Sequence, residues 1–157
     1  MTEHIAYCNG WPDAFPVAQE INDCMNADMS AYLLWYIRRS YGPINEDGSI
    51  NKGGYLIAQY SKFVRPGFYR VKTKVDPSRS DIQVTAYKDG SKVVLVVLNT
   101  NPTIEQTFAI PNSNATSFTP YVTSGSKNCQ KGSAITVSNG SFSGILDAMS
   151  VTTFVSN

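Results

Sequence analysis

Residues 82–98 read IQVTAYKDGSKVVLVVL and carry the clearest secondary-structure signal in the chain. Apolar side chains occupy every second position in residues 82–87, which is the period of a half-buried β-strand. The pair Asp89 and Gly90 then indicates a tight hairpin turn. Residues 93–98 are apolar without interruption and predict the second strand of the hairpin. The region around this hairpin is therefore expected to be antiparallel β-structure.

Short segments of the same kind continue on both sides of the hairpin after Gly67. Clusters of Ser, Asn, Gly and Pro separate further predicted strands at residues 68–74, 104–110, 118–122, 135–137, 142–146 and 151–155. Eight short strands joined by turn signals indicate an antiparallel β-sandwich over residues 67–157.

Residues 1–66 have a helical pattern instead. Apolar residues recur at three- and four-residue spacing in residues 14–24 and again in residues 56–64, which predicts two amphipathic helices. Residues 31–37 are apolar on both faces, as in a parallel strand buried between helices. This order is typical of an α/β layer structure.

One strand and two helices cannot bury their own apolar faces, because a parallel strand needs neighbours on both sides. Residues 1–66 are therefore interpreted as the end of a larger sheet or barrel, with apolar faces that are exposed or covered by another copy. The alternative is an α+β domain in which these elements cover one face of the sandwich.

Composition excludes several classes of function. Hydrophobic residues make up 42% of the 157 residues, charged residues 16%, and the net charge is +1. No basic surface field is expected to attract nucleic acid or anionic membrane, and no apolar run approaches the ~18 residues of a membrane span. His4 is the single histidine, and Cys8, Cys24 and Cys129 show no C-x-x-C spacing. No metal or cofactor is expected, because metal-ligand and nucleotide-binding motifs are absent.

Carboxylates, aromatics and arginines remain, and these are the residue types that bind and hydrolyse sugars. Residues 35–43 read WYIRRSYGP. If the preceding strand continues, one side of it carries Trp35, Ile37, Arg39 and Tyr41, and the other side carries Tyr36 and Arg38. In α/β barrels the C-terminal end of a strand carries the active site, although adjacent arginines more often form a solvated face.

The block 35–43 resembles glycoside hydrolase family 30, in particular its bacterial-type glucuronoxylanase subfamily. The start MTEH, the stretch SKFVRPG at 61–67 and the ending SVTTFV at 150–155 extend this resemblance in order along the chain. The resemblance implies an α/β plus all-β chain. Residues 1–66 would be the last units of an incomplete (β/α)₈ TIM barrel, and residues 67–157 a β-sandwich side domain.

The same resemblance implies the roles of individual residues. Glu3 matches the catalytic nucleophile, Trp35 an aromatic of the sugar site, and Arg39 and Tyr41 the residues that hold the glucuronic-acid carboxylate. The implied function is that of a secreted, retaining endo-β-1,4-xylanase acting on glucuronoxylan without a cofactor. The acid/base glutamate of the family lies on an earlier strand, outside these residues. The chain alone is therefore predicted to be inactive and to need the missing N-terminal barrel portion.

Two departures and one rival interpretation accompany this prediction. Ile5 and Cys8 stand where the family usually has a Tyr and a Ser that assist glucuronate recognition, so the resemblance does not imply a strict dependence on the branch. The rival is a non-catalytic carbohydrate-binding or structural β-sandwich module in residues 67–157. Sugar binding there is disfavoured because both tryptophans, Trp11 and Trp35, precede Gly67.

Overall fold

The computed structural model describes residues 10–157, which form two helices followed by nine strands. The helices are α1 (Phe15–Asn26) and α2 (Lys52–Ser61). The strands are β1 (Tyr69–Val71), β2 (Ile82–Asp89), β3 (Lys92–Asn99), β4 (Ile104–Ala109), β5 (Ser117–Thr123), β6 (Gln130–Lys131), β7 (Ile135–Thr136), β8 (Ser141–Leu146) and β9 (Ser150–Ser156). Both predicted helices and all eight predicted strands are present. The two-residue strand β6 was not expected, because two polar residues carry no periodicity.

The strands form two antiparallel sheets. Seven strands make the larger sheet, in the order β1-β2-β3-β9-β5-β6 with β7 also paired to β5, while β4 pairs only with β8. In the β2–β3 hairpin Asp89 pairs with Lys92, so Gly90 and Ser91 form the predicted turn. Gly90 has a φ of 55°, a left-handed conformation that glycine adopts without a steric penalty. This arrangement agrees with the predicted antiparallel sandwich.

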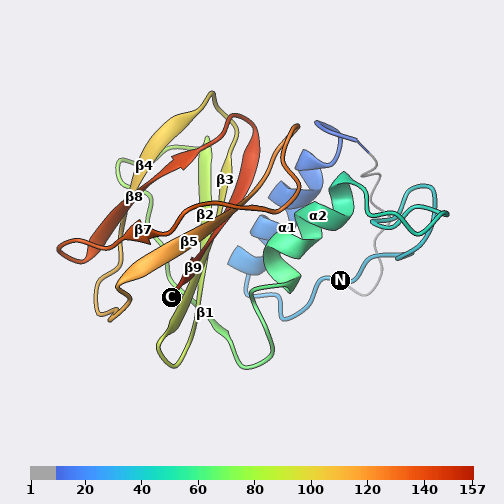
Figure 1. The fold of residues 1–157 in the computed structure, drawn as a ribbon. Helices are drawn as coiled ribbons and strands as arrows, with labels where there is room; N and C mark the ends of the chain where they lie inside the picture. Colours follow the sequence, from blue (N-terminus) through green and yellow to red (C-terminus); the bar gives the residue numbers. More distant parts are fainter. Residues whose placement is uncertain (1–9) are drawn as a thin grey trace.

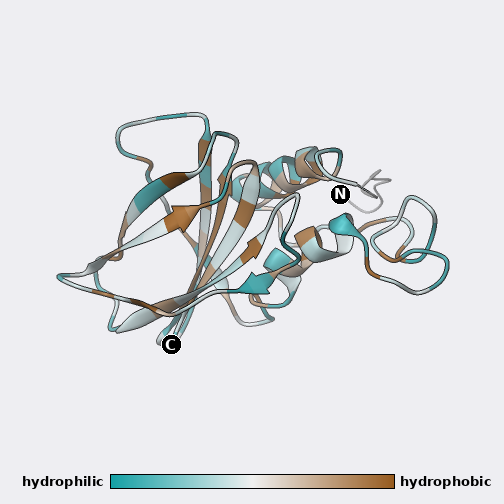
Figure 2. Cartoon of the chain, turned by 45° about the horizontal axis from the view of Figure 1, so that its top comes forward, coloured by the Kyte–Doolittle hydropathy of each residue, from teal (hydrophilic) through white to brown (hydrophobic). Residues whose placement is uncertain are grey.

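The larger sheet is covered on both faces, as Figure 1 shows: helices α1 and α2 lie on one side, and the β4–β8 pair lies on the other. Along β3, Val94, Val96 and Leu98 join the core beneath the helices. The alternate residues Val93, Leu95 and Val97 join the core beneath β4 and β8. Apolar residues accordingly follow the central strands (Figure 2). Burial on both faces explains why residues 93–98 are apolar at every position.

Four phenylalanines form the centre of the core between the two sheets. They are Phe108, Phe118, Phe142 and Phe154, with ring centroids 4.4–5.3 Å apart in the contacting pairs. Gly144 on β8 makes room for this cluster, because a Cβ there would lie 2.8 Å from two ring carbons of Phe154. The aromatic side chains of the sandwich are thus mainly core residues.

The predicted parallel strand at residues 31–37 is wrong. This segment belongs to the irregular connection between α1 and α2, where the bridges are isolated, as between Arg38 and Ile44. A parallel strand needs partners that satisfy its backbone groups, and the described residues provide none beside it. Its side chains are accordingly exposed, with Leu33 at 50% and Ile37 at 67%. The predicted exposure of apolar faces is confirmed for this segment.

Helix α1 behaves differently, because the sheet covers its apolar side. Ala14, Ala18 and Ile21 are buried in the same cluster as Leu56 of α2 and Val96 of β3. The described residues thus show two helices covering one face of the larger sheet. Neither helix has the length and apolar character that a bilayer-spanning helix requires.

We expect the substitution Phe154→Ala to lower the free energy of unfolding by about 3–5 kcal/mol, because it leaves a cavity among the packed rings. The control Tyr69→Ala removes an aromatic side chain that is 57% exposed, so it should change stability by less than about 0.5 kcal/mol. Urea unfolding followed by circular dichroism measures both. Equal losses would contradict the central place of Phe154 in the core.

Candidate functional site

Three of the four predicted site residues, Trp35, Arg39 and Tyr41, lie in the α1–α2 loop, which we define as residues 27–51. Glu3 lies outside the described residues, as do Ile5 and Cys8. The geometry of the candidate site is therefore known for the residues of this loop.

Trp35, Tyr36 and Arg39 form one cluster on the surface of the loop. The rings of Trp35 and Tyr36 have centroids 4.1 Å apart at an interplanar angle of 39°. The guanidinium carbon of Arg39 lies 4.8 Å from the centroid of the Tyr36 ring, which is a cation–π contact. Trp35 and Tyr36 remain 41% and 38% exposed, so both rings are accessible to a ligand.

The predicted alternation of side chains along residues 35–41 is wrong, since Tyr36 contacts both Trp35 and Arg39. The segment turns instead of continuing as a strand, and its side chains do not keep a period of two. Tyr36 is consequently a residue of the site that the sequence argument placed on the opposite face. Its position directly after Trp35 and two residues before the arginine pair was the available signal.

Arg38 has a structural contact outside this cluster. Its Nε donates a hydrogen bond to the carbonyl oxygen of Glu46 at 3.1 Å, and its Nη2 donates to the same oxygen. Next to it, the hydroxyl and amide of Ser49 donate to Asp47 at 2.6 and 2.8 Å and hold the pKa of Asp47 below its usual value. This geometry gives Arg38 a structural contact with a backbone carbonyl.

The turn that contains Tyr41 is closed by backbone contacts. The amide of Gly42 donates to the carbonyl of Arg39 at 3.0 Å, and the amide of Ile44 donates to the carbonyl of Ile37 at 3.0 Å. A Cβ at Gly42 would lie 2.4 Å from the carbonyl oxygen of Tyr36, so this close approach requires glycine. The half-buried Tyr41 is held within this turn.

The chemistry of the cluster suits a sugar that carries a carboxylate. Aromatic faces stack on pyranose rings, and a guanidinium forms paired, charge-assisted hydrogen bonds to a carboxylate. Within residues 10–157 no group of three or more His, Cys, Asp or Glu side chains is arranged to hold a metal ion.

Comparison with known proteins identifies relatives of this chain. The chain is 46% identical over 149 residues to the glucuronoxylanase XynC of Bacillus subtilis strain 168, covering 94% of this chain and 35% of that protein. The chain is a homologue of glycoside hydrolase family 30 xylanases. It aligns to the C-terminal portion of these relatives and spans about a third of their length. No family model matches it.

Solved structures of family 30 xylanases share the fold. A family 30 endoxylanase from Clostridium papyrosolvens C71 superposes with a TM-score of 0.93 at 37% identity, covering 100% of this chain and 41% of that one. The subfamily 8 xylanase Xyn30A from Clostridium acetobutylicum gives a TM-score of 0.91 at 36% identity, covering 100% and 42%. The resemblance of the chain to family 30 is therefore confirmed.

The substitution Gly42→Ala is expected to displace the turn and to lower the free energy of unfolding by about 1–3 kcal/mol, because the new methyl group meets the Tyr36 carbonyl. The near-ultraviolet circular dichroism of the Trp35–Tyr36 pair should change with it. Gly10→Ala is the matched control, since a Cβ at Gly10 would have no heavy atom of residues 10–157 within 4 Å. An unchanged spectrum in Gly42→Ala would show that the turn does not depend on glycine.

Proposed function

We propose that this chain is the C-terminal part of a retaining endo-β-1,4-xylanase that acts on glucuronoxylan. In this proposal residues 1–66 are the last units of a (β/α)₈ barrel, and residues 67–157 are the side β-sandwich. The observation that carries it is the accessible cluster of Trp35, Tyr36 and Arg39 in a chain 46% identical to a glucuronoxylanase. The exposure of Leu33 and Ile37 supports the barrel assignment, because neighbouring barrel units would cover them. Secretion is proposed from the same family resemblance.

The proposed reaction uses Glu3 as the nucleophile. Its carboxylate attacks the anomeric carbon of a xylose unit, and the glycosidic oxygen leaves after it receives a proton from a general acid. A glycosyl-enzyme ester forms, and water then hydrolyses it while the same acid/base residue accepts a proton. In this proposal the acid/base glutamate belongs to an N-terminal barrel portion outside these 157 residues.

Recognition of the substrate is assigned to the α1–α2 loop. The ring of Trp35 is exposed enough to stack on a sugar, and Arg39 has a planar donor fork suited to the carboxylate of glucuronic acid. Tyr41 is proposed to hold the same carboxylate. Arg38 is committed to the Glu46 carbonyl and has a structural role in this scheme.

The rival function, a sugar-binding module in residues 67–157, has less support. Of the aromatic side chains in this range only Tyr69 is exposed, and the phenylalanines pack against one another in the core. A sugar platform needs exposed rings, so these residues favour a structural role for the sandwich.

Arg39→Ala, introduced into a complete enzyme that carries this segment, should reduce kcat/KM on glucuronoxylan about ten- to a hundredfold, because a charge-assisted fork is lost. Cleavage of unbranched xylan should fall much less. Ile5 and Cys8 place the expected effect at the lower end. Kinetics on the two substrates measure the difference, and equal losses would mean that Arg39 has a structural role.

The purified 157-residue chain should release no reducing sugar from glucuronoxylan. A retaining mechanism needs two carboxyl groups about 5–5.5 Å apart, and the sequence supplies a convincing match only for Glu3. Glu3→Gln is the control variant. Turnover that disappears in Glu3→Gln would show that the second carboxyl group lies within this chain.

A further inference from the structure

Asn51 lies at the junction between the α1–α2 loop and helix α2, and its side chain is almost fully buried. Its Nδ2 donates hydrogen bonds to the carbonyl oxygen of Gly42 at 2.6 Å and to Oδ1 of Asn45 at 3.1 Å. Its Oδ1 accepts a hydrogen bond from the amide of Gly54 at 3.3 Å, which caps the N-terminus of α2. One amide group thus joins the loop to the helix.

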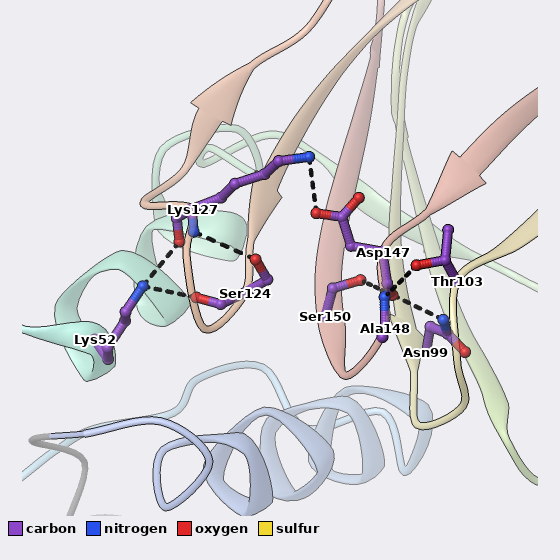
Figure 3. A network of polar contacts seen from close by, with 8 residues as sticks. All are labelled: Lys52, Asn99, Thr103, Ser124, Lys127, Asp147, Ala148 and Ser150. Atoms are coloured by element: carbon purple, nitrogen blue, oxygen red, sulfur yellow. Dashed lines mark hydrogen bonds and ion pairs between the residues drawn. The ribbon is translucent and has the colours of Figure 1, made fainter.

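The helix end of this junction is fixed to the sheet, as Figure 3 shows. Nζ of Lys52 donates to the carbonyl oxygens of Ser124 and Lys127 at 2.6 and 3.1 Å. The same Nζ also donates to Oδ1 of Asn128 at 2.7 Å. Lys127 in turn forms an ion pair with Asp147 at 2.8 Å, which extends the network to the β8–β9 turn. Partial burial lowers the pKa of Lys52. The three oxygen acceptors offset the free-energy cost of removing its ammonium group from water.

A second, buried contact holds α2 in the same place. Nε2 of Gln59 donates to Oγ1 of Thr123 at 2.7 Å, and Oγ1 of Thr153 donates to the carbonyl of Gln59 at 2.8 Å. All three side chains are fully buried. Helix α2 is therefore a rigid support fastened to strands β5 and β9.

The loop end of the junction lies directly beside the predicted sugar-binding residues. Gly42 follows Tyr41, and its backbone amide donates a hydrogen bond to the carbonyl oxygen of Arg39. We propose that Asn51 is a positioning residue, which fixes the turn of Arg39 and Tyr41 to the rigid frame of α2 and the sheet. The inference rests on the proposed function in so far as Arg39 and Tyr41 bind glucuronate.

An asparagine is needed here because its amide donates and accepts hydrogen bonds at the same time. Aspartate at this position keeps the acceptor that caps the helix, but it cannot donate to Gly42 or Asn45. The substitution Asn51→Asp therefore keeps the cap of α2 and removes the hydrogen bonds that attach the loop, so the two roles of Asn51 can be tested separately.

Amide hydrogen exchange in the 157-residue chain tests the attachment. In Asn51→Asp the hydrogen-bonded amides of Arg39, Gly42 and Ile44 should exchange about tenfold faster, while the amides of α2 stay within about threefold. Asn128→Asp is the matched control, because it makes the same chemical change beside Lys52 at the other side of the network. Loop amides that keep their rates, or loop and helix amides that accelerate equally, would overturn the proposal.

Kinetics in the complete enzyme test the recognition role. Asn51→Asp should lower kcat/KM on glucuronoxylan about tenfold, mainly through KM, and should leave cleavage of unbranched xylan nearly unchanged. If Arg39→Ala selectively lowers activity on glucuronoxylan and Asn51→Asp does not, the role of Asn51 is wrong and the proposed function stands. If Arg39→Ala has no selective effect, the proposed recognition function fails, and the role of Asn51 in it fails as well.

Discussion

Burial of strand β3 on both of its faces is the constraint on which the rest of the structure depends. The strand lies between β2 and β9, and its side chains alternate between two separate clusters of buried apolar residues. A sheet with two apolar faces needs two covering layers, because water would otherwise contact the aliphatic side chains. The β4–β8 pair supplies one layer and the two helices supply the other (Figure 1).

The helical layer links the core to the candidate site. Helix α2 contributes Leu56 to the core between the helices and the sheet, and Gln59 connects the helix to buried sheet residues by hydrogen bonds. Its N-terminal end holds part of the polar network of Figure 3 through Lys52, and the capping residue Asn51 holds the turn at Gly42 in the α1–α2 loop. An accessible arginine and two aromatic rings are therefore presented on an irregular segment whose supporting helix is rigid. Such an arrangement is typical of binding residues carried by loops on a stable scaffold.

The sequence predicted the elements whose signals are local. The alternation in residues 82–87, the Asp89-Gly90 turn and the apolar run in residues 93–98 each specify a conformation within a few neighbouring residues. Trp35, Arg39 and Tyr41 were predicted as site residues from the composition of one nine-residue block and its family resemblance. The strand at residues 31–37 was wrong, because a parallel strand exists only where other strands pair with it, and no local pattern guarantees those partners.

By itself, the sequence determined both helices and every strand of residues 67–157 except β6, together with the antiparallel character of that range and the chemical types available to the site, since periodicity and residue identity are local properties. Only the tertiary structure decided that Tyr36 lies between Trp35 and Arg39 and that Arg38 binds a backbone carbonyl. It also brought Asn51 to Gly42, and Lys52 to Ser124, which is 72 residues away along the chain. Contacts of this kind depend on how turns and layers fold back on one another, and the spacing of residues along the chain does not encode that geometry.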